Sequence, residues 1–214
     1  LINAVGRIGD PKLIIDLCTN ESKVCIDKLT KECFDTNKER KLITSLIEQE
    51  ALEIAVKEFK NDRKFLVLMN REWHPGIIGI VAARMVDKFN LPTAIISKAN
   101  DGNFRGSIRS NNFLKVNLAL DECDDLLIAH GGHSAAAGFS IKEENIYKLK
   151  EKLNNIASRE FKNTNLNKSI KPDARVSLED INKDFYKQLC MIGPFGIMNP
   201  APIFWTRKCK IIEI

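Results

Sequence analysis

The order of hydrophobic and polar positions predicts a helical first part of the chain. Residues 1–10 contain two glycines and are predicted to form a turn, and Pro11 suits the first turn of a helix. From residue 21 to 59 apolar residues recur at a spacing near 3.6, with Lys and Glu opposite, which predicts a long amphipathic helix. Such a helix is typical either of a connector between two bodies or of an ordinary surface helix.

In the middle of the chain, short apolar runs alternate with helical patterns. The predicted strands cover residues 65–70, 93–99 and 103–110, and the predicted helices cover 74–89, 116–123 and 143–161. Between them, residues 126–141 read as a Gly-Gly turn that leads into a buried strand. Strands that alternate with helices predict an α/β layer fold with a mixed sheet.

The last part of the chain predicts a linker and a second domain. Residues 162–172 are polar, basic and without periodicity, as in a linker. A helix near 182–191, a Gly/Pro-rich turn and alternating residues at the end follow. We therefore expect four parts: 1–60 with the long connecting helix, 61–161 as an α/β domain, 162–172 as a linker, and 173–214 as the start of a β-rich domain that is cut short.

Composition and charge narrow the class of protein only moderately. Hydrophobic residues make up 44% of the chain, which is enough for a core, and the net charge of +5 permits a polyanionic partner without proving one. The six cysteines show no C-x-x-C pair, so a structural zinc site is not expected, and they favour a reducing compartment, the cytoplasm. No apolar run approaches the ~20 residues of a membrane span, so no membrane partner is expected.

The stretch HGGH at residues 130–133 is the first candidate for chemistry. A helix cannot run through two glycines, and no carboxylate or thiolate backs the two histidines, which disfavours a metal site. Glycines let backbone N–H groups approach a ligand, and a histidine adds a donor, which together suit a phosphate. The alternative is a glycine turn that merely ends in a histidine. If the stretch is a phosphate cradle, His133 takes part in catalysis, whereas His130 packs toward the core.

Two further stretches carry candidate anion-binding residues. Arg105, Ser107 and Arg109 alternate along a predicted strand and share one face, which fits a phosphodiester backbone or, alternatively, a solvated edge strand. His74 precedes a predicted helix N-terminus, where backbone donors favour an anion. The chain shows no Asp/His cluster with metal-ligand spacing and no Ser-His pair that stands out. We therefore expect it to hold a substrate and not to cleave it alone.

Five stretches resemble one family. GGHSAAAGFS (131–140) resembles the glycine-histidine signature of the DHH-associated domain in the DHH phosphoesterases. WHPGIIGIVAARM (73–85) and FRGSIRS (104–110) are similar to the same domain in the RecJ-type single-strand-specific exonucleases. INAVGRIGD (2–10) resembles the end of their DHH catalytic domain, and GPFGIMNPAPIF (193–204) the opening of their OB-type domain, with departures at Met198 and Ala201.

This resemblance implies a 5′-to-3′ single-stranded-DNA exonuclease that acts in DNA repair and recombination. It implies Mn²⁺ or Mg²⁺ as cofactor, held by Asp and His ligands upstream of Leu1, so that this part alone is expected to be inactive. Single-stranded DNA is the expected partner, with a single-strand-binding protein and a helicase as further partners and a monomer as the oligomeric state.

The resemblance also assigns residues. Arg7 matches an arginine that faces the active-site cleft, and Ser107 and Arg109 match contacts to the substrate phosphate. Gly131, Gly132 and His133 match a loop that closes over the scissile bond, with His133 as the catalytic member. The predicted substrate-binding set consists of Arg7, His74, Arg105, Ser107, Arg109, Ser110, Gly131, Gly132 and His133.

Two other functions fit parts of the pattern. One is a small DHH-family oligoribonuclease or phosphoadenosine phosphatase, and the other is a non-catalytic nucleic-acid-binding module like that of alanyl-tRNA synthetases. The small enzymes end soon after the glycine-histidine stretch, whereas this chain continues through the Pro-Phe-Gly segment. The synthetase module lacks a counterpart of GRIGD. Both points favour the exonuclease.

Overall fold

The computed structural model describes residues 1–111, 113–162, 171–196, 198–207 and 209–210, which form two compact units, Leu1–Leu166 and Asn167–Ile214. The helices of the first unit are α1 (Ile2–Ile8), α2 (Lys12–Thr19), α3 (Lys23–Lys60), α4 (Ile78–Phe89), α5 (Val116–Asp121), η1 (Asp124–Leu126), η2 (Glu143–Asn145) and α6 (Ile146–Glu160). Its strands are β1 (Leu66–Met69), β2 (Thr93–Lys98), β3 (Phe104–Arg109), β4 (Leu127–His133) and β5 (Ala136–Ile141).

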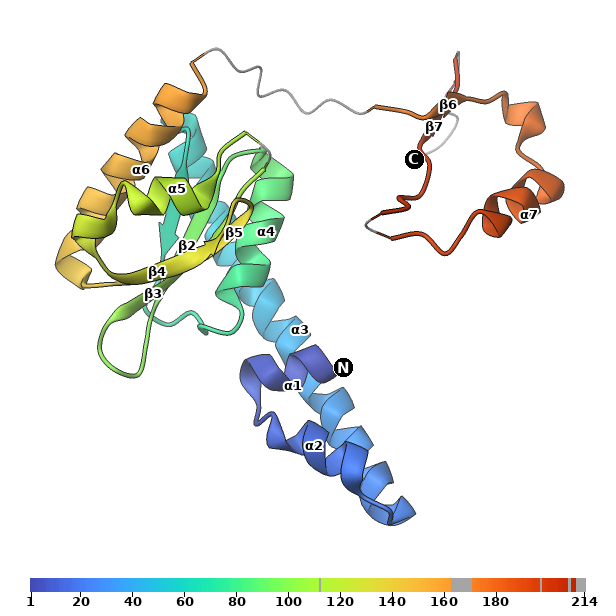
Figure 1. Ribbon diagram of the computed structural model, residues 1–214, viewed down its shortest axis with the longest axis horizontal. Coiled ribbons are helices and arrows are strands. Elements are labelled where there is room, and N and C mark those ends of the chain that lie inside the picture. The colour runs from blue at the N-terminus through green and yellow to red at the C-terminus, as the bar shows by residue number, and fades with distance from the viewer. Residues whose placement is uncertain (112, 163–170, 197, 208, 211–214) are drawn as a thin grey trace. The chain divides into compact units, whose positions relative to one another are not determined.

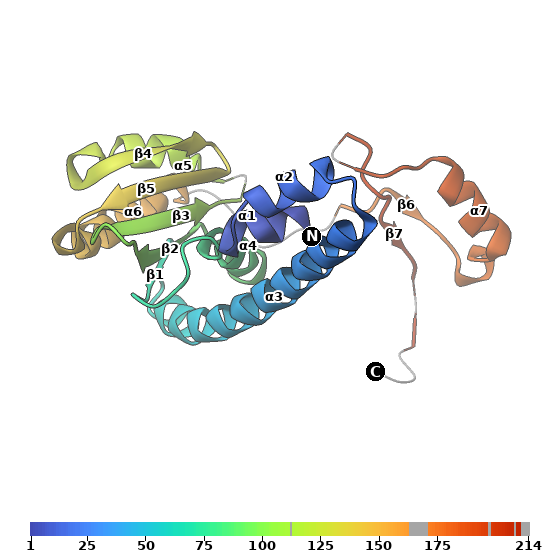
Figure 2. The same cartoon turned by 90° about the horizontal axis from the view of Figure 1, so that it is seen from below.

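The long helix α3 joins a helical hairpin to a sheet. It runs unbroken for 38 residues, as predicted; α1 and α2 pack on its first part, and α4 and β1 contact it as well (Figures 1 and 2). The turn predicted for residues 1–10 is wrong, because this segment forms helix α1, whose Ala4 and Val5 are buried. Of the helices that the structure describes, none combines the length and apolar character that crossing a membrane requires.

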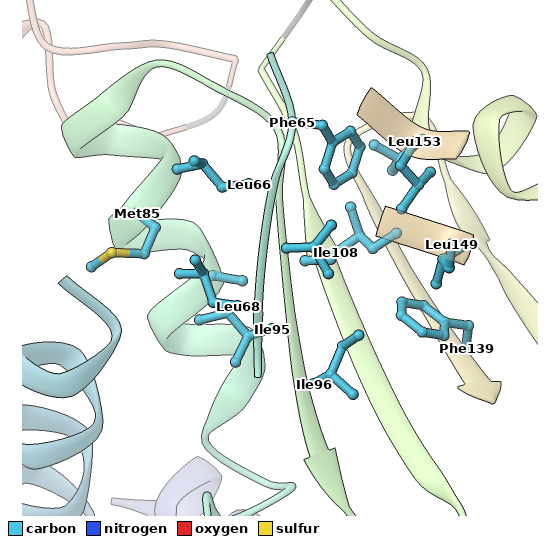
Figure 3. Close-up of a cluster of buried hydrophobic side chains, with 14 of the residues drawn as sticks. Phe65, Leu66, Leu68, Met85, Ile95, Ile96, Ile108, Phe139, Leu149 and Leu153 are labelled. Atoms are coloured by element: carbon cyan, nitrogen blue, oxygen red, sulfur yellow. The ribbon is translucent and has the colours of Figure 1, made fainter. Parts of the chain in front are cut away.

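A five-stranded mixed sheet with the order β1-β2-β3-β5-β4 forms the centre of the first unit. The pair β1–β2 is parallel and the other pairs are antiparallel. Helix α4 covers one face and α6 the other, and both bury apolar side chains against the strands, with Leu66 and Met85 on the α4 side and Phe139 and Leu149 on the α6 side (Figure 3). The predicted α/β class is confirmed.

Two predicted elements differ from the structure. The helix predicted from residue 74 begins at Ile78, because residues 74–77 form a turn in which the Gly76 N–H donates to Nδ1 of His74. The predicted Gly-Gly turn is strand β4, which reverses into β5 after His133. Gly132 has a φ of +148°, and a Cβ there would lie 2.4 Å from the oxygen of Ala136. Gly132 therefore permits a tight strand pairing, whereas a Cβ on Gly131 would meet no atom within 4 Å.

The second unit contains β6 (Ala174–Arg175), η3 (Leu178–Asp180), α7 (Lys183–Met191) and β7 (Phe204–Trp205), and β6 and β7 pair in parallel. Asn182 caps α7, since its side chain accepts from the N–H groups of Asp184 and Phe185. The helix predicted near 182–191 is thus confirmed. Most of the predicted linker, at 163–170, and the end of the predicted strands, at 211–214, lie outside the described residues.

Candidate nucleic-acid interface

A cleft of about 540 Å³ opens on the α4 side of the sheet. Its walls are the end of α1, the turn before α4 with the first residues of that helix, and strands β3, β5 and β4. Four predicted substrate-binding residues line it, namely Arg7, Arg105, Ser107 and Arg109. They come from positions far apart in the sequence, so the tertiary fold brings them together.

Two glycines allow the walls of the cleft to approach each other. A Cβ on Gly76 would lie 2.0 Å from the carbonyl oxygen of Arg7, so α1 rests directly on the backbone of this turn. A Cβ on Gly79 would lie 3.0 Å from Oγ of Ser107 and 3.1 Å from Nη2 of Arg109. The Arg7 Nη1 group donates to the Gly76 carbonyl over 3.2 Å, which fixes this arginine at the rim.

The arginines of the cleft differ in their charge compensation. Arg109 donates from Nη1 to Oγ of Ser107 (3.1 Å) and to the carbonyl of Ile108 (2.8 Å). Burial, and then the positive charge of Arg7, lower the pKa of Arg109 from its usual value, although a guanidinium stays protonated. Within the described part of the chain neither Arg7 nor Arg109 has a carboxylate partner, whereas Arg105 pairs with Asp101 at 3.3 Å. Arg7 and Arg109 therefore form a cationic pair that an anion would stabilise.

On the face of the sheet that carries these arginines, the neighbouring positions of β5 and β4 are occupied mainly by small residues. Residues in register lie on the same face, and Ser107, Gly138 and Gly131 stand side by side on β3, β5 and β4. In the same way Arg109, Ala136 and His133 follow one another across the three strands. His133 therefore lies on the same face of the sheet as Arg109, with Ala136 of β5 between them.

His130 lies on the opposite face, in register with Phe139, and its side chain is largely buried. Its Nε2 lies 3.1 Å from an Asp124 carboxylate oxygen, and its Nδ1 lies 3.8 Å from Asp121. His130, which also belongs to the lining of the cleft, thus faces two exposed carboxylates, and its predicted packing toward the core stays a prediction. The two histidines of the HGGH stretch thus have different surroundings.

The remaining predicted residues do not line the cleft. The Ser110 hydroxyl lies within hydrogen-bonding distance of the carbonyls of Leu114 (2.8 Å) and Asn111 (3.0 Å), which share its single proton, and so it fixes the loop after β3. His74 accepts a backbone hydrogen bond in the turn before α4. The side chain of Trp73, which precedes it, is buried and donates to Glu50 of α3 over 2.7 Å. The binding roles of His74, Ser110, Gly131, Gly132 and His133 stay predictions.

Sequence reasoning did not select Gly76 and Gly79, although they determine how closely α1 and β3 approach α4. The pattern that could have identified them is the Gly-x-x-Gly spacing around the N-terminus of a predicted helix. This spacing places two residues without side chains on one side of the chain, where another element can pack closely.

Metal ligands of the kind that a two-metal hydrolase needs are not grouped in this structure. No set of three or more His, Cys, Asp or Glu side chains that could hold an ion occurs among the described residues. Asp121 and Asp124 flank opposite nitrogens of one histidine ring, so these three residues cannot converge on one ion. The residues that the structure describes therefore do not fit a metal centre.

Two family models match the chain. Residues 62–159 match the DHHA1 domain, and residues 172–214 match the RecJ OB domain. The "Single-stranded-DNA-specific exonuclease RecJ" of Bacillus subtilis is 33% identical over 202 residues, which cover 94% of this chain and 26% of the relative. The Escherichia coli protein of the same name is 28% identical over 212 residues, 95% of this chain and 36% of the relative. The chain thus spans only a minor part of these relatives.

Solved structures of RecJ have the same fold. RecJ from Thermus thermophilus in complex with Mg²⁺ matches with a TM-score of 0.83 and 26% identity, over 95% of this chain and 31% of that one. The Mn²⁺ complex of the same protein matches with a TM-score of 0.84 and 26% identity, over 96% and 30%. The chain therefore carries a DHHA1 domain and a RecJ OB domain, and over nearly its whole length it is similar to one part of the RecJ exonucleases.

Proposed function

We propose that this chain is the substrate-binding portion of a 5′-to-3′ single-stranded-DNA exonuclease that acts in DNA repair and recombination. The observation that carries the proposal is the pair Arg7 and Arg109, which converges on one cleft without a carboxylate partner in the described part of the chain. Two guanidinium groups beside a hydroxyl form a site for a phosphate group, because they supply several donors and a double positive charge.

The residues of the cleft and of the neighbouring strand β4 have distinct proposed roles. Arg109 and Ser107 bind a phosphate oxygen from the sheet, and Arg7 binds it from α1. Arg105 is engaged with Asp101 and contributes less. His133 donates toward the phosphate from the edge strand, and the backbone of Gly131 and Gly132 allows the nucleic acid to approach β4 closely. None of these contacts reads a base edge, so binding would be independent of sequence.

The chemical step is proposed to take place elsewhere in the complete protein. The family resemblance assigns Mn²⁺ or Mg²⁺ to a DHH domain, where the ions would activate water for phosphodiester hydrolysis. This chain would hold and orient the strand, and would be inactive by itself. The RecJ OB match behind the DHHA1 domain favours this function over a small oligoribonuclease or a synthetase-like module.

The proposed partners follow from the proposed substrate. Besides single-stranded DNA they are a single-strand-binding protein and a helicase, which expose or deliver such strands. We propose a monomer in the cytoplasm, where this substrate arises.

Substitution of Arg109 by Gln tests the phosphate site. We expect Arg109→Gln to weaken the binding of a 5′-phosphorylated oligothymidylate about ten-fold or more, because one charge-assisted contact is lost. The slope of log affinity against log salt should also fall by about one. Fluorescence anisotropy of a labelled oligonucleotide at several salt concentrations measures both quantities.

The matched control removes an arginine charge at an exposed ion pair. Arg159 lies on α6 and pairs with Glu122 at 2.7 Å, outside the lining of the cleft. Arg159→Gln should leave affinity and salt slope nearly unchanged. Equal losses in the two variants, or no loss in either, would contradict the proposed phosphate site.

A further inference from the structure

Glu50, on helix α3, binds the segment between β1 and α4 through two hydrogen bonds. One carboxylate oxygen, Oε2, accepts from Nε1 of the Trp73 indole over 2.7 Å and from Nδ2 of Asn70 over 3.1 Å. The Trp73 side chain is only 3% exposed, so its indole N–H needs a partner inside the protein. A single carboxylate thus ties the long helix to both ends of the turn at residues 70–73.

The same segment reaches the cleft three residues after Trp73. There the carbonyl of Gly76 accepts a hydrogen bond from Nη1 of Arg7 over 3.2 Å. The N–H of Gly76 is engaged as well, because it donates to Nδ1 of His74 over 3.1 Å. The place of the Gly76 carbonyl therefore depends on where the short segment from Trp73 onward is held.

Arg7 needs such a restraint to stay in the cleft. Its positive charge lowers the pKa of Arg109, which means that the two guanidinium groups repel each other. An arginine side chain has several rotatable bonds, so without a fixed acceptor it gains entropy by turning toward water. The Gly76 carbonyl is the acceptor that the structure gives it. The position of this carbonyl therefore decides whether Arg7 remains beside Arg109 before an anion binds.

We propose that Glu50 is a positioning residue for the phosphate site. It holds the turn before α4 through the Trp73 indole, and the Gly76 carbonyl that follows this turn holds Arg7 in the cleft. Glu50 is not among the residues that line the cleft, so it acts without touching the ligand. The inference rests on the proposed function, in which Arg7 binds a phosphate oxygen. An arginine that is held in place beforehand loses less side-chain freedom when the phosphate binds.

A double-mutant cycle with Arg7 tests this route. We expect Glu50→Ala to weaken the binding of a 5′-phosphorylated oligothymidylate about five-fold, and Arg7→Gln to weaken it about ten-fold. In the Arg7→Gln background, Glu50→Ala should have almost no further effect, because the side chain that Glu50 positions is already absent. Fluorescence anisotropy of the labelled oligonucleotide gives the four affinities, and thermal unfolding checks that each variant is folded.

Three further variants separate the hydrogen bond from a general loss of packing or charge. Glu50→Gln keeps an oxygen that accepts from the indole, so it should retain most of the affinity. Trp73→Phe keeps an aromatic ring but removes the donor, and should weaken binding about as much as Glu50→Ala does. The matched control is Glu48→Ala, which removes another carboxylate of α3, one that pairs with Arg84 of α4. This control should leave the affinity nearly unchanged.

The indole N–H of Trp73 reports on the same bond without any nucleic acid. The chain has two tryptophans, so Trp205→Phe leaves a single indole signal in a proton–nitrogen correlation spectrum. In this background Glu50→Ala should shift the signal and accelerate the exchange of its proton with solvent. Glu48→Ala should do neither, and Glu50→Gln should keep the exchange slow.

The outcomes distinguish a failure of this inference from a failure of the proposed function. If Arg7→Gln weakens binding but Glu50→Ala does not, or if Glu50→Ala causes equal losses in both backgrounds, the positioning role is overturned and the proposed function stands. Glu50→Gln binding as weakly as Glu50→Ala would overturn it too. If neither Arg7→Gln nor Arg109→Gln changes the affinity, the proposed function fails, and the role of Glu50 fails with it. Should Glu50→Ala not fold, Trp73→Phe takes its place in the cycle.

Discussion

Replacing His133 by Ala in a full-length protein that contains this chain is expected to lower turnover on single-stranded DNA by about 10²–10³-fold. His133 follows Arg109 and Ala136 across the arginine side of the sheet, and only small side chains lie between. A donor at this position would stabilise the negative charge that builds on the phosphate during water attack. The thermal midpoint should change little, because the side chain is exposed.

His130 provides the matched control within the same strand. Its side chain lies on the other face, near Asp124 and Asp121, and connects β4 to η1 and the end of α5. His130→Ala should therefore cost about 1 kcal/mol of stability and leave turnover nearly unchanged. Single-turnover kinetics and thermal unfolding of both variants measure the two effects. Normal turnover in His133→Ala would contradict the catalytic role of this histidine, which would then be only the last residue of strand β4.

Gly106→Ala is expected to destabilise the protein by about 1–3 kcal/mol. Gly106 and Phe139 are register partners on β3 and β5, and the aromatic ring lies across the glycine. A Cβ on Gly106 would lie 2.0 Å from Cζ of Phe139, so the ring or the strand would have to move. Denaturation by urea, followed by circular dichroism, gives the free energy of unfolding.

A second substitution and a control show whether the ring is the cause. In the double variant Gly106→Ala/Phe139→Leu, the loss should be smaller than the sum of the two single losses, since leucine vacates part of the space. Gly138→Ala lies in the neighbouring strand, where the nearest atom to a new Cβ is 3.7 Å away, and it should be tolerated. Strict additivity in the double variant would show that Phe139 does not limit the space at residue 106.

The elements that were predictable from the sequence are those in which local pattern and burial agree. Strand β2 is almost uniformly buried and reads as an apolar run, and β3 alternates so that Arg105, Ser107 and Arg109 share a face. Helix α1 was missed because Gly6 favours a turn, whereas burial of Ala4 and Val5 stabilises the helix. Strand β4 was missed because the Gly-Gly pair favours a turn, whereas Gly132 instead allows the close approach of Ala136 and Ala137 across the β4–β5 hairpin.

The candidate site was predictable only in part. The face of β3 follows from the strand period of two, which needs no knowledge of the fold. The approach of Arg7 to Arg109 is different, because the two residues are far apart in sequence and meet through Gly76 and Gly79. Arg7 entered the predicted set through a family resemblance alone. Contacts of this kind depend on how α1 and the sheet each pack against α3. A local sequence pattern does not predict such packing.

Because α3 is continuous, the number of residues in it sets the angle around its axis at which α1 stands relative to the sheet. Near its start Thr36 faces Gly9 behind α1, and farther on Ile47 and Ala51 belong to the core that includes the sheet. Each helical residue turns the axis by about 100° and advances it by about 1.5 Å. A single inserted residue between Thr36 and Ile47 would therefore rotate α1 far around the axis and carry Arg7 away from Arg109. Seven inserted residues would nearly restore the angle but would still move α1 by about 10 Å along the axis, and so would also separate the two arginines. The cleft is thus tied to the number of residues in a helix that contributes no side chain to it.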